Sequence, residues 1–129
     1  MKNVNHLFPT KRIAVVAPEE KRKELIEWSY FNKNVLANHD LIATYTTANL
    51  LEGTVNKPVY KLSVDHAGGY QQLYTMIQDK KVDVILFFDN PMKTVGADDS
   101  MRKLLDIALE MNIVIANNGS RQEFMSATA

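Results

Sequence analysis

The sequence predicts a three-layer α/β domain built on a doubly wound, five-stranded parallel sheet. Short apolar runs of strand length alternate along the chain with segments in which apolar residues recur at helical spacing. Several of the strand-like runs are continuously apolar, which is typical of parallel strands that helices cover on both faces. The chain has 129 residues, 46% of them hydrophobic, and is long enough for one such domain with a buried core.

The chain begins with a polar lead-in over residues 1–10, and the first strand is expected at 12–17. Pro18 and the two glutamates after it favour a helix start, because proline suits the first helical position and acidic side chains suit the helix dipole. Gly53 is expected to end a later helix. The expected elements are the strand at 12–17, a helix from 19 to about 38, a strand at 40–44 and a short helix from 47 to about 52.

The rest of the chain continues the alternation, and a single domain is expected to cover residues 11–129. Residues 58–63 alternate like a half-exposed edge strand, and a loop is expected over 64–69. The run at 82–88 is the most hydrophobic and is therefore expected to be the central strand. The remaining expected elements are helices at 71–80, 98–111 and 120–126, and a last strand at 113–116.

Composition limits the classes of function. Lys and Arg number 15, as do Asp and Glu, so there is no basic surface of the kind that favours nucleic acid or an acidic membrane. The absence of cysteine excludes disulfides and thiolate metal ligands. The polar residues 1–10 lack the apolar core of a signal peptide, and the longest apolar run, 84–88, is too short to span a bilayer. The expected location is therefore the cytoplasm.

Three threonines, Thr44, Thr46 and Thr47, lie where the second expected strand turns into a helix. The first N–H groups of a helix have no partner within it, so together with these hydroxyls they can bind an anion such as phosphate. The alternative is ordinary capping, in which one threonine caps the helix and the others fill space. Open α/β sheets bind ligands outside the carboxyl ends of their strands, and this position favours the phosphate site.

Motifs near the ends of the expected strands resemble those of a known family. They are Val16-Ala17, Ala43-Thr44-x-Thr46-Thr47-x-Asn49-Leu50, Gly68-Gly69-x-Gln71-Gln72, and the run 84–88 followed by Pro91. Together, over Arg12 to about Ser126, they resemble methylglyoxal synthase. The resemblance implies a flavodoxin-like domain that assembles as a homohexamer. It also implies elimination of phosphate from dihydroxyacetone phosphate to give methylglyoxal, with no metal and no organic cofactor.

The resemblance further implies which residues bind the ligand. In that family a Thr-x-Thr-Thr corner and a serine–glycine loop hold the substrate phosphate, so the partner is a small phosphorylated metabolite or inorganic phosphate, with no nucleic acid and no membrane. The same fold also serves as a non-catalytic regulatory domain, for example in carbamoyl phosphate synthetase, where it binds effectors. The matching residues here are Thr44, Thr46, Thr47, Asn49, Ser63, Gly68, Gly69 and Arg22.

The residues at the positions of the family's acid–base catalysts depart from the family pattern. The family's general base is an aspartate directly after Gly-Gly, and here this position is Tyr70. A carboxyl group with a pKa near ~4 is ionised at neutral pH, whereas a tyrosine with a pKa near ~10 is not. The family's His-Asp after the first strand is Pro18-Glu19, which loses the imidazole. The tentative substitutes for the acid–base set are Asp65, His66, Glu19 and Asp98.

Three hypotheses follow, because the binding corner is kept while the acid–base residues are replaced. The first is a protein that binds a small phosphorylated ligand of the dihydroxyacetone phosphate class without the standard activity, in which Tyr70 could stack on a larger ligand. Loss of the base and the imidazole should remove useful turnover, since general acid–base catalysis contributes about 10²–10⁴-fold. The second is an active methylglyoxal synthase with a rearranged acid–base set, and the third is a non-catalytic regulatory or assembly module.

Overall fold

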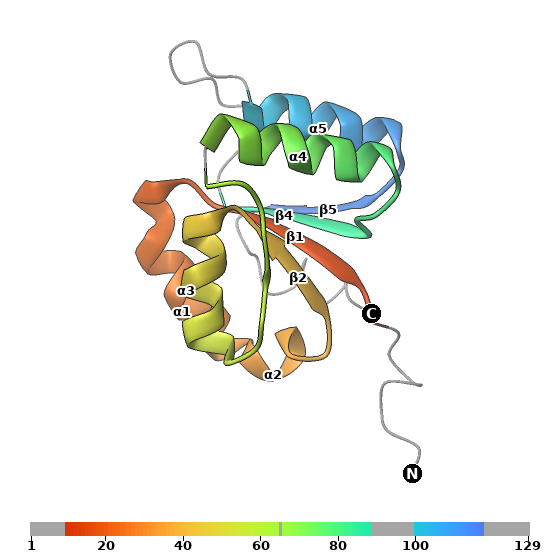
Figure 1. The fold of residues 1–129 in the computed structure, drawn as a ribbon. Helices are drawn as coiled ribbons and strands as arrows, with labels where there is room; N and C mark the ends of the chain where they lie inside the picture. Colours follow the sequence, from red (N-terminus) through yellow and green to blue (C-terminus); the bar gives the residue numbers. More distant parts are fainter. Residues whose placement is uncertain (1–9, 65, 89–99, 118–129) are drawn as a thin grey trace.

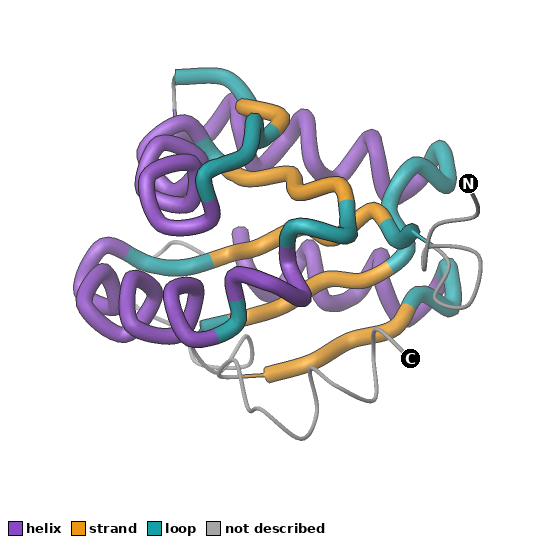
Figure 2. Tube along the Cα trace, turned by 90° about the horizontal axis from the view of Figure 1, so that it is seen from below, coloured by secondary structure: helices purple, strands orange, loops and turns teal. Residues whose placement is uncertain are grey.

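The fold is built on a five-stranded parallel sheet with the strand order β3-β2-β1-β4-β5 (Figure 1). The structure is a computed structural model, and it describes residues 10–64, 66–88 and 100–117. Figure 2 shows the strands running side by side. The strands are β1 (Arg12–Val16), β2 (Asp40–Ala43), β3 (Tyr60–Lys61), β4 (Val84–Phe87) and β5 (Val114–Asn117).

Helices cover both faces of the sheet, which confirms the predicted three-layer, doubly wound architecture. The helices α1 and α3 lie on one face, and α4 and α5 lie on the other (Figure 1). No helix within the described ranges is long and apolar enough to cross a membrane. The helical elements are η2 (Glu19–Lys21), α1 (Arg22–Phe31), α2 (Lys33–Leu36), α3 (Tyr45–Val55), α4 (His66–Gln78) and α5 (Ser100–Glu110).

The core is divided between the two faces because side chains alternate along each strand. In β1, Ile13 and Val15 face α1 and α3, whereas Ala14 and Val16 face α4 and α5. All four residues of β4 are fully buried, as expected for the most hydrophobic run. The middle strand is nevertheless β1, with β4 beside it, so hydrophobicity predicted an interior strand but not the exact strand order.

Helix α3 differs from the expected one at both ends. It begins at Tyr45, with Thr44 at the N-cap position, and it continues through Gly53 to Val55. The expectation that Gly53 ends this helix is wrong. Asn56 ends it instead, with φ of 60° in the left-handed region that asparagine tolerates better than most residues, and its N–H donates to the Glu52 carbonyl at 3.0 Å.

Helix α4 begins at His66, so the loop expected over 64–69 is wrong for Gly68 and Gly69. A Cβ atom on Gly69 would lie 3.3 Å from the Ser63 carbonyl oxygen and 3.5 Å from Thr44 Cγ2. This glycine therefore serves a close approach between α4 and the ends of β2 and β3, rather than a special loop conformation. Sequence reasoning treated the Gly-Gly pair as a loop signal and so placed the helix start too late.

The helix expected from residue 19 to about 38 is divided into η2, α1 and α2. The division falls at Asn32, whose side-chain Nδ2 donates to the Trp28 carbonyl at 2.8 Å. This hydrogen bond uses an acceptor at the end of α1, which is the local competition that makes asparagine a weak residue for helix interiors. The expected lead-in over 1–9 and the expected helix at 120–126 lie outside the described residues.

Candidate functional site

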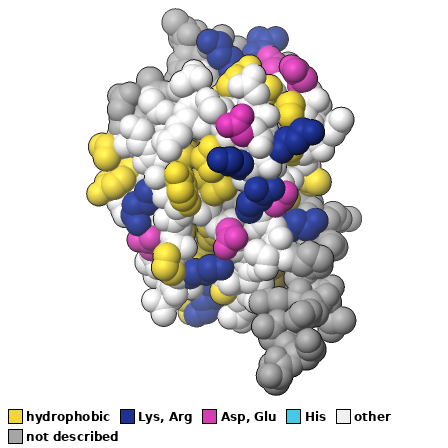
Figure 3. Space-filling view, turned by 45° about the vertical axis from the view of Figure 1, so that its right-hand side comes forward, with side chains coloured by type: hydrophobic (Ala, Val, Ile, Leu, Met, Phe, Trp, Pro, Cys, Tyr) yellow, Lys and Arg dark blue, Asp and Glu magenta, His cyan; other side chains and the backbone are white. Residues whose placement is uncertain are grey.

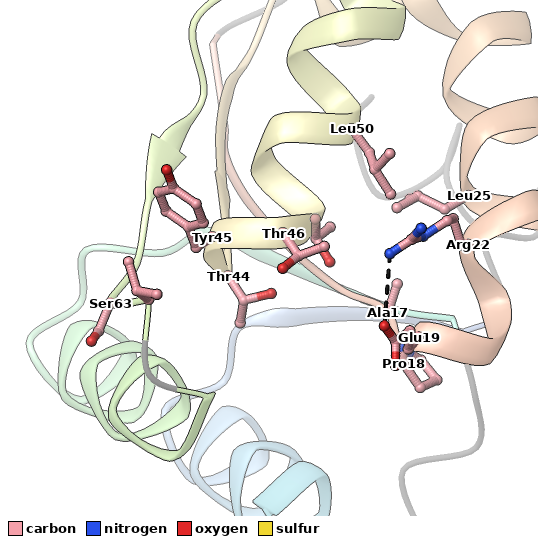
Figure 4. A pocket seen from close by; sticks show the side chains of 12 residues that line it. Ala17, Pro18, Glu19, Arg22, Leu25, Thr44, Tyr45, Thr46, Leu50 and Ser63 are labelled. Carbon is pink, nitrogen blue, oxygen red and sulfur yellow. Dashed lines mark ion pairs between the residues drawn. The ribbon is translucent and has the colours of Figure 1, made fainter.

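A cavity of about 230 Å³ opens at the carboxyl ends of β1 and β2, between the start of α1 and the start of α3 (Figure 4). Three segments supply its walls: residues 17–19 with Arg22 and Leu25, residues 44–47 with Leu50, and Ser63 with Val64. This is the edge of the sheet at which open α/β folds bind ligands. The position agrees with the one that the sequence predicts for a ligand site.

A second, more open hollow of about 490 Å³ lies at the opposite edge, near Arg12, Asp40 and Tyr60. Figure 3 brings that side of the molecule forward and shows hydrophobic side chains in the middle of the face, with charged side chains of both signs around them. Arg12 is already bound to Asp83, with Nε 3.0 Å from Oδ2. The first cavity is the one that contains the threonines of the predicted phosphate site.

The threonine corner, Thr44 with Thr46 and Thr47, forms one wall of the first cavity. Thr44 occupies the N-cap position of α3, but its side chain makes no capping hydrogen bond. Across the described part of the chain, none of the three hydroxyls has a hydrogen-bond partner, although Thr47 is only 5% exposed. The simple capping alternative is therefore wrong for Thr44.

The first turn of α3 adds backbone donors to this corner. The first helical hydrogen bond runs from the Ala48 N–H to the Thr44 carbonyl, at 2.7 Å. The N–H groups of the three residues before Ala48 precede that bond, so helix geometry gives them no acceptor. The positive end of the helix dipole therefore lies beside the three hydroxyls.

Arg22 lies on the opposite wall, with the threonines between it and Tyr45 (Figure 4). Its Nη2 is 3.7 Å from Glu19 Oε2, an exposed ion pair of a kind that contributes little stability. A guanidinium carries five N–H donors, so this single contact leaves most of them available to a ligand. The Arg22 guanidinium therefore faces the cavity from one wall, and the threonine hydroxyls and the free N–H groups of α3 face it from the other.

The other residues predicted to bind phosphate are arranged less directly. Ser63 lines the cavity, but Figure 4 shows its hydroxyl pointing away from the threonines, and its N–H donates to Gln72 Oε1 at 2.9 Å. Asn49 is exposed on α3 and does not line the cavity. Gly68 and Gly69 do not line it either, although Gly69 lets α4 approach the Thr44 side chain closely.

Among the side chains that the structure describes, one candidate acid–base residue lies in the cavity. Glu19 lines it beside Arg22. Asp65 and Asp98 lie outside the described residues. The backbone of His66 begins α4, and its side chain lies outside the described part as well.

Tyr70, at the family's base position, is 7% exposed and packs in the core between the sheet and the helices α4 and α5. It does not line the cavity, so the idea that it stacks on a larger ligand is wrong. It shares the buried stripe of α4 with Leu73 and Ile77, at the spacing of one helix face. Sequence reasoning missed this because it placed Tyr70 before the helix rather than inside it.

Tyr45 lines the cavity, although sequence reasoning gave it no role of its own. It is the first residue of α3 and is 42% exposed. Val64, which is 76% exposed, lines the same cavity. The signal was present in the sequence, because an aromatic residue stands between Thr44 and Thr46 in the corner itself.

Among the residues that the structure describes, the groups with clearly shifted pKa values lie away from this cavity. Hydrogen bonds from Arg12 lower the pKa of Asp83, and burial lowers the pKa of His39. A hydrogen bond from Lys61 lowers the pKa of Glu52, whose carboxylate also accepts the Val59 N–H at 2.9 Å. These groups connect neighbouring segments of the chain, so their shifts are explained by structure rather than by catalysis.

Comparisons with known proteins agree with this architecture. Residues 24–117 match the family described as "MGS-like domain". Methylglyoxal synthase from Coxiella burnetii is 37% identical over 115 residues, which cover 89% of this chain and 80% of the relative. The enzyme of the same name from Yersinia enterocolitica is 35% identical over 119 residues, covering 92% and 78%.

A solved structure supports the same assignment. The crystal structure of methylglyoxal synthase from Elizabethkingia anophelis matches with a TM-score of 0.76 and 30% sequence identity, covering 90% of this chain and 76% of that one. The structural match therefore extends over most of this chain. The chain therefore belongs to the MGS-like domain family, with the methylglyoxal synthases among its relatives.

Proposed function

We propose that this protein binds a small phosphorylated metabolite, of the dihydroxyacetone phosphate class, at the threonine corner. One observation carries the proposal: Thr44, Thr46 and Thr47 present hydroxyls without partners among the described residues, at a helix start that faces a cavity. Phosphate oxygens accept hydrogen bonds from such hydroxyls and from free helix N–H groups, and the helix dipole favours the negative charge.

Arg22 supports the same proposal from the other wall. Hydrogen bonds between a guanidinium and a phosphate are charge-assisted, and arginine can donate two in parallel. Glu19 would then accept from a hydroxyl of the ligand's organic part, since a carboxylate beside a phosphate would otherwise repel it. Inorganic phosphate fits the corner by the same contacts.

We further propose that the standard methylglyoxal synthase reaction is strongly reduced. Tyr70 replaces the expected base and is buried in the core, and Glu19 is the one carboxylate that lines the cavity among the described residues. General acid–base catalysis contributes about 10²–10⁴-fold, so loss of the positioned base alone would lower the rate by that order.

A second candidate function is an active methylglyoxal synthase with a rearranged acid–base set. The relatives that carry this name, at 35% and 37% identity, favour it. In this case Glu19 would act with Asp65, His66 or Asp98. A colorimetric methylglyoxal assay with dihydroxyacetone phosphate separates the two: rapid turnover that Glu19→Gln abolishes would support the enzyme, and turnover below detection would support the binding protein.

Isothermal titration calorimetry with inorganic phosphate and dihydroxyacetone phosphate tests the binding proposal. We expect Thr46→Val to weaken binding of both by about tenfold or more, because a hydrogen bond to a charged group contributes about 1.5–3 kcal/mol. Thr75→Val is the matched control, since Thr75 is exposed on α4 and its hydroxyl donates to the Gln71 carbonyl at 3.2 Å.

Two outcomes would contradict the binding proposal. One is the absence of binding of any phosphorylated compound to a folded protein, as judged by circular dichroism. The other is equal affinity in wild type and Thr46→Val, which would leave the threonines without a role and would favour a regulatory or assembly module.

A further inference from the structure

Tyr45 adds an apolar wall to the candidate site. Binding of phosphate at the threonine corner does not require such a wall. Its ring stands on the side of the threonines away from Arg22, toward Ser63 (Figure 4). It is 42% exposed, and within the described residues its hydroxyl has no hydrogen-bond partner. A tyrosine at this position is therefore neither a core residue nor part of a polar network.

Val64 adds a second exposed apolar side chain to the cavity lining. It is 76% exposed and lines the cavity next to Ser63. A single exposed apolar side chain is ordinary, but two in the lining of one cavity, together with hydroxyl donors, match the make-up of small-molecule pockets. Such pockets combine apolar and aromatic side chains with a few polar groups that fix the ligand's orientation.

The size of the cavity limits the ligand. Its volume of about 230 Å³ is several times the roughly 30 Å³ that one water molecule fills in the liquid, so room remains beyond an anion at the corner. It is also below the roughly 300–1,000 Å³ of pockets for drug-sized ligands. A phosphate with one attached ring fills a space of this size, whereas a nucleotide, which has both a sugar and a base, would extend from the cavity into solvent.

We propose that Tyr45 makes the site selective for the phosphate of a cyclic sugar, with the phosphate at the threonine corner and one face of the sugar ring against the tyrosine. This inference rests on the proposed phosphate binding and narrows its ligand class. A sugar ring presents C–H groups on its face and hydroxyls at its edge. The face packs on Tyr45, on the side of the threonines away from Arg22, while Arg22 donates to the phosphate at the corner (Figure 4).

Calorimetric titration of wild type with four compounds tests the inference: inorganic phosphate, dihydroxyacetone phosphate, glucose 6-phosphate and uridine monophosphate. We expect glucose 6-phosphate to bind about tenfold more tightly than the other three, because an aromatic contact together with its buried area is of that order. Unphosphorylated glucose should show no measurable binding, since the phosphate supplies the charge-assisted contacts.

Variants of Tyr45 separate the contribution of its aromatic ring to binding from the contribution of the threonine corner. We expect Tyr45→Ala to weaken glucose 6-phosphate binding about tenfold and to leave the affinity for inorganic phosphate within about twofold. Tyr45→Phe should keep the preference, because it keeps the ring. Tyr60→Ala is the matched control, since Tyr60 is also an exposed tyrosine but lies at the opposite edge of the sheet. A cooperative thermal unfolding transition shows for each variant that it is folded.

The inference would be overturned by three results. Glucose 6-phosphate could bind no more tightly than dihydroxyacetone phosphate, Tyr45→Ala could weaken both phosphates equally, or uridine monophosphate could bind most tightly. In each case inorganic phosphate still binds, and the proposed phosphate site stands. Failure of every phosphate, including inorganic phosphate, would instead contradict the proposed function itself.

Discussion

At the residue scale, Thr47 shows why the threonine corner is a credible site. The side chain is 5% exposed and lines the cavity, and its hydroxyl has no partner among the described residues. The hydroxyl itself is accessible from the cavity, so it is free to bond to water or to a ligand. A phosphate oxygen at the corner would replace that water, and a hydrogen bond to a charged acceptor contributes about 1.5–3 kcal/mol.

Gly69 is the residue that sets how closely α4 approaches this corner. An alanine Cβ at this position would lie 3.3 Å from the Ser63 carbonyl oxygen, which is tight enough to force a small backbone shift. We expect Gly69→Ala to weaken phosphate binding by about threefold to tenfold, because the shift also moves Thr44. The free energy of unfolding should change by less than about 1 kcal/mol, since alanine is the better helix former. Calorimetry and urea unfolding measure both effects.

The outcome that would contradict this role is unchanged phosphate affinity in a Gly69→Ala protein of wild-type stability. The contact between the alanine Cβ and the Ser63 carbonyl oxygen would then be accommodated without a shift of Thr44. Gly53→Ala is the matched control for helix propensity, because no atom lies within 4 Å of a Cβ placed there. It should leave phosphate binding unchanged.

At the scale of elements, α3 shows how packing overrides a local signal. Gly53 predicts a helix end, yet the buried residues Ala48, Leu51 and Val55 form one stripe that continues past it. The free energy of burying Val55 exceeds the roughly 1 kcal/mol by which glycine disfavours a helix interior. The helix therefore continues until Asn56, where a left-handed residue ends it.

This account predicts that Gly53→Ala stabilises the protein. Gly53 is exposed in the interior of α3, and a Cβ there meets nothing within 4 Å. We expect the free energy of unfolding to rise by about 0.5–1 kcal/mol, which is the difference in helix propensity between the two residues. Urea unfolding monitored by circular dichroism measures it. A loss of stability would mean that glycine at this position is needed for a reason other than helix propensity.

At the scale of the whole molecule, polar contacts hold together the edge of the sheet opposite the cavity. Arg12 and Asp83 join the starts of β1 and β4 by an ion pair and by backbone hydrogen bonds. His39 is 3% exposed before β2, and its Nδ1 accepts the Lys11 N–H at 3.0 Å. The Lys57 ammonium donates to the carbonyls of Ala37 and His39. These contacts fix one edge of the sheet while the other edge stays open to ligand.

His39 should make stability depend on pH. Burial first, and then the positive charges of Lys57 and Lys11, lower its pKa in the folded protein below the ordinary value of about 6.5. The unfolded chain therefore binds the proton more readily. The contribution of neutral His39 to stability is fully present above about pH 6.5 and is lost as the pH falls toward the folded-state pKa. We expect the free energy of unfolding to fall between pH 7 and pH 5.5.

The variant His39→Asn tests this assignment, because an asparagine oxygen can accept the Lys11 N–H without titrating. Urea unfolding at a series of pH values should show a smaller fall for the variant than for wild type. If the two proteins lose stability equally over this range, another group is responsible for the pH dependence.

The sequence by itself determined the fold class, the number of strands and the place of the threonine corner. The continuous apolar run of β4 and the helical stripe of α5 are local patterns. A segment with such a pattern forms the same element wherever its apolar residues are buried. The edge position of β3 is as expected, but the strand covers only Tyr60–Lys61 rather than 58–63, and both residues are exposed instead of alternating. The resemblance to methylglyoxal synthase agrees with the family match over residues 24–117.

Only the tertiary structure decided where Tyr70 and Tyr45 point. Both tyrosines lie within a few residues of the predicted site, and their spacing alone does not say which one faces the cavity. Because α4 begins at His66 and packs tightly through Gly69, Tyr70 turns into the core. Because α3 begins at Tyr45, that ring stands at the cavity wall. The start of a helix fixes the direction of every side chain in it, and here packing between distant segments set both starts.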